Sequence, residues 1–119
     1  MVFSRRTHNR FPCDLKVEVH TGPTGGIRIG EGILMDLSVS GALLRFAGLI
    51  KLGSVYRVTV KWQEGSLDLP CRVARAAGPK AYGLAFNLTY DQEKALMRLI
   101  DRVRRGDAGP DSFMKGYWG

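Results

Sequence analysis

The sequence predicts a mainly β fold, a small six-stranded antiparallel β-barrel with a C-terminal α-helix packed against it. Three observations lead to this prediction. Apolar and polar residues alternate along much of the chain, turns rich in Gly and Pro separate these runs at hairpin spacing, and one amphipathic helical segment follows the last run. The 119 residues, 45% of them hydrophobic, suit one domain that buries its own core.

The first two strands are predicted on either side of a Gly- and Pro-rich loop at 21–26. From 14 to 20, apolar residues alternate with polar ones, which is typical of a half-buried strand. The run 27–37 predicts a long second strand, weakened or bent at Gly30 and Gly32.

The third and fourth strands are predicted at 42–46 and 56–62, separated by a connection that contains two glycines. The fourth strand has the clearest alternation in the chain. Tyr56 and Trp62 share its apolar phase, so we expect both in the core.

The fifth strand follows a hairpin turn and places alternate apolar residues inward from Leu67 to Val73. Pro70 falls on the opposite face, where a missing N–H group indicates an edge or bulge position. A turn at 78–81 leads into the sixth strand at 82–87.

One helix is predicted after Thr89, which with Gln92 has the spacing of a capping box. Apolar residues recur at helical spacing from Leu96 to Val103 and predict the face that lies against the barrel. Gly106 follows a basic last turn and is typical of a helix C-terminus.

The expected organisation is a flexible arginine-rich arm at 1–11, the barrel with its helix at 12–106, and a tail at 107–119. We expect the tail to be flexible, although its aromatic residues leave docking onto this or another subunit as the alternative. No apolar run approaches the ~20 residues of a membrane span, and no signal peptide precedes the arm, which predicts a cytoplasmic protein. Cys13 and Cys71 are expected to be reduced, half-buried thiols.

Two short polar motifs predict the binding chemistry. Three guanidinium groups lie on the arm, at Arg5, Arg6 and Arg10, and each can grip a phosphate or a purine edge. The segment 36–41, Asp-Leu-Ser-Val-Ser-Gly, adds a carboxylate, a hydroxyl and a glycine in a turn. With a net charge of +7, the pair suggests an anionic nucleotide ligand, although the charge alone would also suit DNA, RNA or anionic lipid.

These motifs resemble those of the PilZ family of bacterial cyclic di-GMP receptors. The family pattern is Arg-x-x-x-Arg, often with an extra Arg in front, followed by Asp/Asn-x-Ser-x-x-Gly. The matching residues here are Arg5, Arg6, Arg10, Asp36, Ser38 and Gly41. The segments 71–75 and 82–86 also look like the last two core strands of the family, so the resemblance covers about 4 to 105.

The resemblance implies a role for each motif residue. Arg6 and Arg10 would hold phosphate and the guanine Hoogsteen edge, while Asp36 would accept hydrogen bonds from guanine N1–H and N2–H₂. Ser38 would donate to a phosphate or base edge, and Gly41 would let the turn approach the ligand closely.

Arg5 and Arg75 suggest further ligand contacts, the first through the resemblance and the second through its place in the strand. Arg5 would stack on a second guanine, which favours two cyclic di-GMP molecules per domain. Arg75, in the inward phase of its strand near the site, is a further candidate; the alternative is a strand-end residue that reaches water. Ligand binding would order the arm, which would then contact an unidentified effector protein in motility, exopolysaccharide or biofilm control.

Other functions fit the sequence less well. Only two histidines are present and no Cys/His cluster has metal spacing, so neither an enzyme nor a metal site is expected. The main alternative is a basic small barrel that binds single-stranded nucleic acid through exposed aromatic residues. A third reading is a degenerate PilZ module that binds only protein, against which stands the presence of every motif position.

Overall fold

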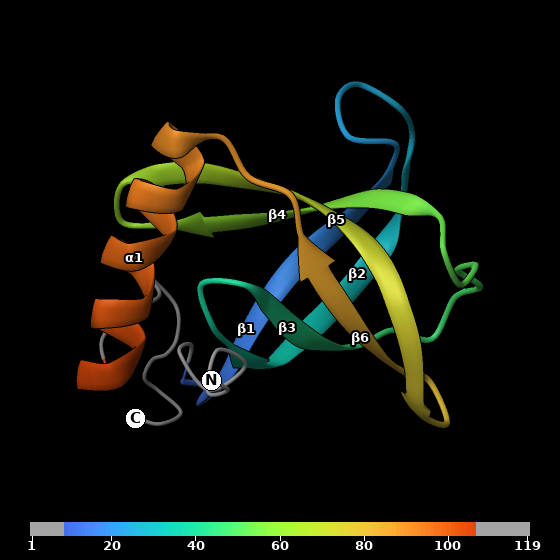
Figure 1. Cartoon of the computed structure of the whole chain (residues 1–119), viewed down its shortest axis with the longest axis horizontal. Coiled ribbons are helices and arrows are strands. Elements are labelled where there is room, and N and C mark those ends of the chain that lie inside the picture. Colours follow the sequence, from blue (N-terminus) through green and yellow to red (C-terminus); the bar gives the residue numbers. More distant parts are fainter. Residues whose placement is uncertain (1–8, 107–119) are drawn as a thin grey trace, which may run out of the picture.

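The computed structural model describes residues 9–106, which form six strands and one helix (Figure 1). The strands are β1 (Phe11–Thr21), β2 (Arg28–Leu37), β3 (Gly41–Arg45), β4 (Val55–Trp62), β5 (Gly65–Gly78) and β6 (Ala81–Phe86). The helix α1 spans Tyr90–Arg105. The predicted fold class is confirmed.

The strands form a closed antiparallel barrel in the order β1-β2-β3-β6-β5-β4. Pairing of β4 with β1 closes the ring, so each of the six strands has two neighbours. The pairing of β3 with β6 joins segments that are distant in the chain, and it brings the β2–β3 turn beside the last two strands. Closure leaves no long unpaired strand edge in this part of the chain.

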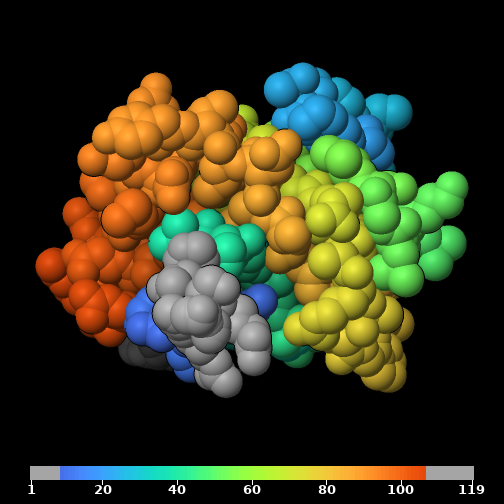
Figure 2. All heavy atoms as spheres, in the orientation of Figure 1, coloured from blue at the N-terminus to red at the C-terminus, as the bar shows by residue number. Residues whose placement is uncertain are grey.

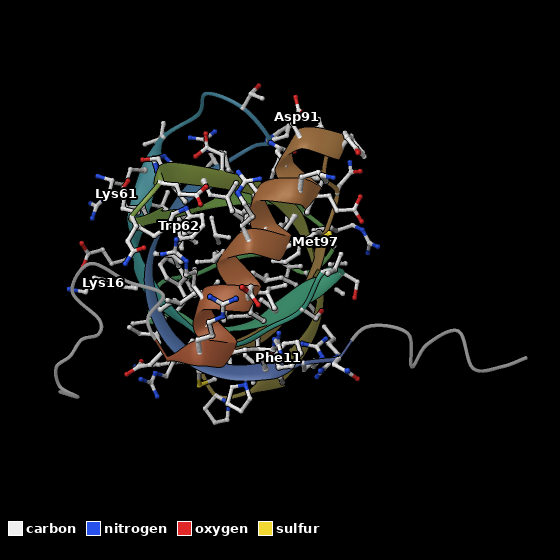
Figure 3. All side chains as sticks on the ribbon, turned by 90° about the vertical axis from the view of Figure 1, so that its left-hand side faces the viewer. Phe11, Lys16, Lys61, Trp62, Asp91 and Met97 are labelled. Atoms are coloured by element: carbon white, nitrogen blue, oxygen red, sulfur yellow. The ribbon has the colours of Figure 1, made fainter. Side chains whose placement is uncertain are left out.

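The core consists of the alternate apolar side chains of all six strands, and one face of α1 closes it. The helix lies across one end of the barrel (Figure 3) and buries Leu96, Leu99 and Ile100. Trp62 is only 6% exposed, which confirms its predicted place in the core. With 16 residues, many of them charged, α1 is too short and too polar to cross a membrane, and it is the one helix of the described range.

Both predicted ends of α1 are confirmed. The Thr89 hydroxyl accepts a hydrogen bond from the Gln92 N–H at 3.1 Å, and the Thr89 N–H donates to Gln92 Oε1 at 2.8 Å. This capping box satisfies donors that the first helical turn leaves free. Gly106 ends the helix with a φ of 81°, the left-handed conformation that glycine adopts without steric cost.

The structure corrects the prediction for Pro70. It pairs with Arg57 of β4 without a register shift, so it occupies neither an edge strand nor a bulge. On its other side the pairing with β6 begins only at Cys71, and the Pro70 carbonyl accepts from the N–H of Asn87. A proline is tolerated here because the ladder with β6 has already ended.

The two thiols are free, as predicted, with Cys71 buried and Cys13 partly buried. Burial raises the pKa of both thiols to about 12. Both therefore stay protonated and weakly nucleophilic near neutral pH.

Candidate ligand-binding site

An ion pair between the two sequence motifs forms the centre of the site. Arg10 lies immediately before β1, and its Nη1 donates to Asp36 Oδ1 at 2.7 Å. The Leu43 N–H donates to the same oxygen at 3.0 Å, which fixes the carboxylate against β3. Both charged side chains remain partly exposed, at 45% for Arg10 and 24% for Asp36. The fold thus brings together two predicted ligand groups that lie 26 residues apart.

Ser38 lies in the same turn but faces inward. It is 1% exposed, and its Oγ accepts hydrogen bonds from the N–H groups of Ser40 and Gly41 at 3.2 and 3.1 Å. The same hydroxyl donates to the Gly41 carbonyl at 3.1 Å. In this structure Ser38 therefore shapes the turn beside Asp36, and its predicted contact with a ligand stays a prediction.

Gly41 is required by the packing of β3 against β6. A Cβ atom at this position would collide with the Leu84 carbonyl oxygen of β6. The sequence prediction explained this glycine by close approach of a ligand, whereas the structure supplies a reason within the barrel itself.

Arg75 lies on the same outer surface of the barrel because of a register shift that the sequence did not indicate. The register shifts between Val73 and Arg75, so the inward phase breaks and Arg75 becomes exposed; its predicted inward orientation is wrong. Cross-strand pairing then sets Asp36, Leu43, Gly83 and Arg75 in one row across β2, β3, β6 and β5. At ~4.8 Å per strand, this row spans about 14 Å.

Glycine at position 83 lets the Arg75 side chain lie flat on the sheet. A Cβ atom at Gly83 would lie 3.0 Å from Arg75 Cγ and 3.1 Å from its Nε. The guanidinium group therefore extends over β6 toward the Asp36 end of the row. Between these two charged ends lie only Gly83 and the partly buried Leu43.

Two further arginines, which the sequence did not single out as site residues, flank this surface. Arg45 pairs with Ala81, and Arg72 pairs with Ala85, so both share the outer face with Gly83. Neither forms an ion pair with another residue of the described range. Their only sequence signal is the outward phase of each strand, which every exposed arginine shares.

Arg5 and Arg6 lie outside the described residues, as does the tail at 107–119, so the predictions for them stay predictions. Within residues 9–106, no group of three or more His, Cys, Asp or Glu side chains is arranged to hold a metal ion. The described part of the site is thus an open, cationic surface with one paired carboxylate.

Comparison with solved structures shows PilZ-type folds. The PilZ domain of CeSA from a cellulose-synthesizing bacterium superposes with a TM-score of 0.67 at 24% identity, covering 81% of this chain and 98% of that one. The PilZ domain of Escherichia coli YcgR, determined with c-di-GMP, gives 0.63 at 18% identity and covers 86% and 93%. The Bacillus subtilis inhibitor of motility MotI gives 0.61 at 20% identity, covering 87% of this chain and 53% of that one.

At these identities the structural likeness establishes the fold alone. Comparison with curated proteins found no match to the sequence. A sequence model of the PilZ domain, however, matches residues 4–102, a span that includes both polar motifs and all six strands. This chain belongs to the PilZ domain family.

Proposed function

We propose that this chain is a cytoplasmic receptor domain for cyclic di-GMP that signals through protein contact in the control of bacterial motility, exopolysaccharide synthesis or biofilm formation. The observation that supports it most directly is the contact of Arg10 with Asp36 on an open cationic face of the barrel. The YcgR structure named above supports the choice of ligand, because that PilZ domain was determined with c-di-GMP.

The hydrogen bonds of Asp36 imply that it exchanges one partner, Arg10, for guanine when the ligand binds. Asp36 Oδ1 already accepts from Arg10 and from the Leu43 N–H. A bidentate contact with guanine N1–H and N2–H₂ needs both carboxylate oxygens. Arg10 would therefore leave Oδ1 and turn its guanidinium fork to a phosphate or to guanine O6 and N7. One charge-assisted hydrogen bond replaces another, so this exchange adds selectivity for guanine more than affinity.

The affinity would then come mainly from the remaining arginines. Arg5 and Arg6 would approach from the arm, and Arg75 would reach the far end of the row from β5. We propose that these arginines together bind two ligand molecules per domain, with Arg5 stacked on the second guanine. Bound ligand would fix the arm against the barrel and so create the surface that an effector protein reads.

Isothermal titration calorimetry of the full chain with cyclic di-GMP tests this function. A charge-assisted hydrogen bond contributes roughly 1.5–3 kcal/mol, so Arg6→Ala, which removes a cation of the arm, should weaken binding by about one to two decades. Arg28→Ala is the matched control, since Arg28 is 47% exposed and pairs with Glu31 at 3.1 Å on another part of the barrel. The affinity of the Arg28→Ala variant for cyclic di-GMP should stay within about twofold of the native value. Absence of binding by the native chain would refute the proposal.

The nucleic-acid alternative has less support from the structure than from the sequence. Trp62 is buried and cannot stack on an extruded base, and the Tyr56 hydroxyl accepts a hydrogen bond from the Lys51 N–H. Salt-sensitive binding of an oligothymidine, with no heat from cyclic di-GMP, would reverse this preference.

A further inference from the structure

The outward face of α1 carries a charged groove that lies apart from the Arg10–Asp36 pair. Figure 3 shows this face toward the viewer, with Asp91 and Met97 labelled on the helix, and Figure 2 shows α1 forming one flank of the molecule. The α1 groove, of about 530 Å³, is lined by Glu64, Lys94, Met97, Arg98, Asp101, Arg102 and Arg105. All but Glu64 belong to α1.

The α1 groove combines an excess of positive charge with exposed apolar surface. Its four cations and two carboxylates leave a net charge of +2 (4 − 2). Met97 is 51% exposed in the middle of the groove, and Tyr90, one turn before Lys94, is 70% exposed. Single exposed apolar residues are common on protein surfaces, so Met97 supports a binding site only in combination with the charges around it.

The helix dipole does not explain this pattern. Basic residues in the last turn, Arg102, Arg104 and Arg105, complement the negative end of the dipole. That effect falls off within one turn, whereas Lys94 and Arg98 lie in the first half and the middle of α1. Contact with the barrel accounts only for Arg98, which pairs with Glu64 of the β4–β5 turn, because the buried stripe of Leu96, Leu99 and Ile100 lies on the other side of the helix.

The two carboxylates of the groove restrict what can bind there. Glu64 forms an ion pair with Arg98, whose Nε lies 3.0 Å away, and Asp101 forms an ion pair with Arg105 at 2.8 Å. A phosphate backbone or an anionic lipid surface would place uniform negative charge against both carboxylates. A protein segment can instead set its own acidic residues opposite Lys94 and Arg102, which form no ion pair within the described range, and an apolar residue on Met97.

We infer that the α1 groove docks an acidic, amphipathic segment of another protein. Lys94, Arg98 and Arg102 repeat every four residues, about 6 Å along the helix axis. Glutamates at the same spacing on a helix lying alongside α1 would face these cations one by one. The inference stands apart from the proposed function, because every contact that carries it lies on α1 or on the β4–β5 turn.

The test is a titration of the isotope-labelled full chain, without cyclic di-GMP, with a synthetic acidic peptide. The peptide is helical, about as long as α1, and carries glutamates at every fourth position with leucines between them. We expect amide shifts confined to α1 and the turn at Glu64. Arg98→Glu should weaken binding by about tenfold or more. Arg28→Glu reverses the charge of a similarly exposed, carboxylate-paired arginine elsewhere and should change affinity by less than about twofold.

A second variant separates a specific contact from general charge attraction. Met97→Ser keeps every charge and should still weaken binding of the peptide about threefold, because the apolar contact is lost. Equal weakening by Arg28→Glu and Arg98→Glu would overturn the inference, as would shifts that map to another face. Tighter binding of phosphatidylglycerol vesicles or of oligothymidine than of the peptide to the groove would overturn it as well. Circular dichroism of each variant establishes that it is folded.

Discussion

At the scale of single residues, Gly41 and Gly83 differ in what a methyl group would meet. In Gly41→Ala the new Cβ would push against the backbone carbonyl of Leu84, which cannot move without disturbing β6. We expect a loss of about 1–3 kcal/mol in the free energy of unfolding, measured by urea denaturation. In Gly83→Ala the Cβ would meet only the flexible side chain of Arg75, so this control should lose less than about 1 kcal/mol. Similar losses in both variants would contradict the packing explanation of Gly41.

A second residue-scale prediction concerns pH. Hydrogen bonds from His20 and then Lys61 lower the pKa of Glu18 in the folded state, with Arg28 adding a smaller attraction. A carboxyl group with a lowered folded-state pKa stabilises the fold above its unfolded-state pKa, and this contribution disappears as the pH falls through the folded-state pKa. The thermal midpoint of the native protein should therefore fall more between neutral and acid pH than that of Glu18→Gln.

Glu31→Gln is the control for this pH experiment. Glu31 is exposed and pairs only with Arg28 among the described residues. Its pH dependence should match the native curve. A Glu18→Gln curve parallel to the native one would show that the Glu18 contacts carry no pH-dependent stability.

At the scale of elements, the capping box of α1 should stabilise the whole domain, because the helix completes the core at one end of the barrel. Thr89→Ala removes the hydroxyl that accepts from the Gln92 N–H. We expect a loss of about 1 kcal/mol in unfolding free energy, with most of it recovered in Thr89→Ser. Loss of helix signal without any change in the global unfolding transition would show instead that α1 unfolds independently of the barrel.

The strands were predictable because each has one face in the core, which forces period-two alternation in the sequence. The prediction failed where the backbone leaves that period. The register shift between Val73 and Arg75 turns Arg75 outward, and no residue type at this point signals a bulge. The inward orientation of Ser38 has a recognisable signal, since a serine in a turn commonly accepts hydrogen bonds from N–H groups two or three residues further on, here those of Ser40 and Gly41.

The site was predictable only in part for a topological reason. Its motif residues were found through a family resemblance, and the fold brings two of them, Arg10 and Asp36, into direct contact. The row from Asp36 to Arg75 depends on the pairing of β3 with β6, which are not consecutive in the chain. Local sequence patterns contain no information on that register, so Gly83 could not be identified as the surface on which Arg75 lies.

At the scale of the whole molecule, Phe11 connects the two surfaces on which functions are proposed. It follows Arg10 directly, and its ring centre lies 5.8 Å from the Arg104 guanidinium carbon at the end of α1. The candidate ligand site is therefore linked by direct contacts to the helix that carries the α1 groove: Asp36 pairs with Arg10, and the next residue, Phe11, contacts Arg104. Figure 3 labels Phe11 beside the lower end of α1. Displacement of Arg10 by a ligand would act on the helix through this ring.

This arrangement predicts that cyclic di-GMP changes the environment of the last turn of α1. In a titration of the isotope-labelled full chain, amide shifts should appear at 102–106 as well as around Arg10 and Asp36. Phe11→Leu keeps an apolar side chain but removes the aromatic face that attracts Arg104, an interaction of about 0.5–1 kcal/mol at exposed sites. The shifts at 102–106 should then shrink while those around Asp36 remain. Unchanged helix shifts in Phe11→Leu would show that any coupling bypasses this ring, because the ligand would still reach α1 after the aromatic contact is lost.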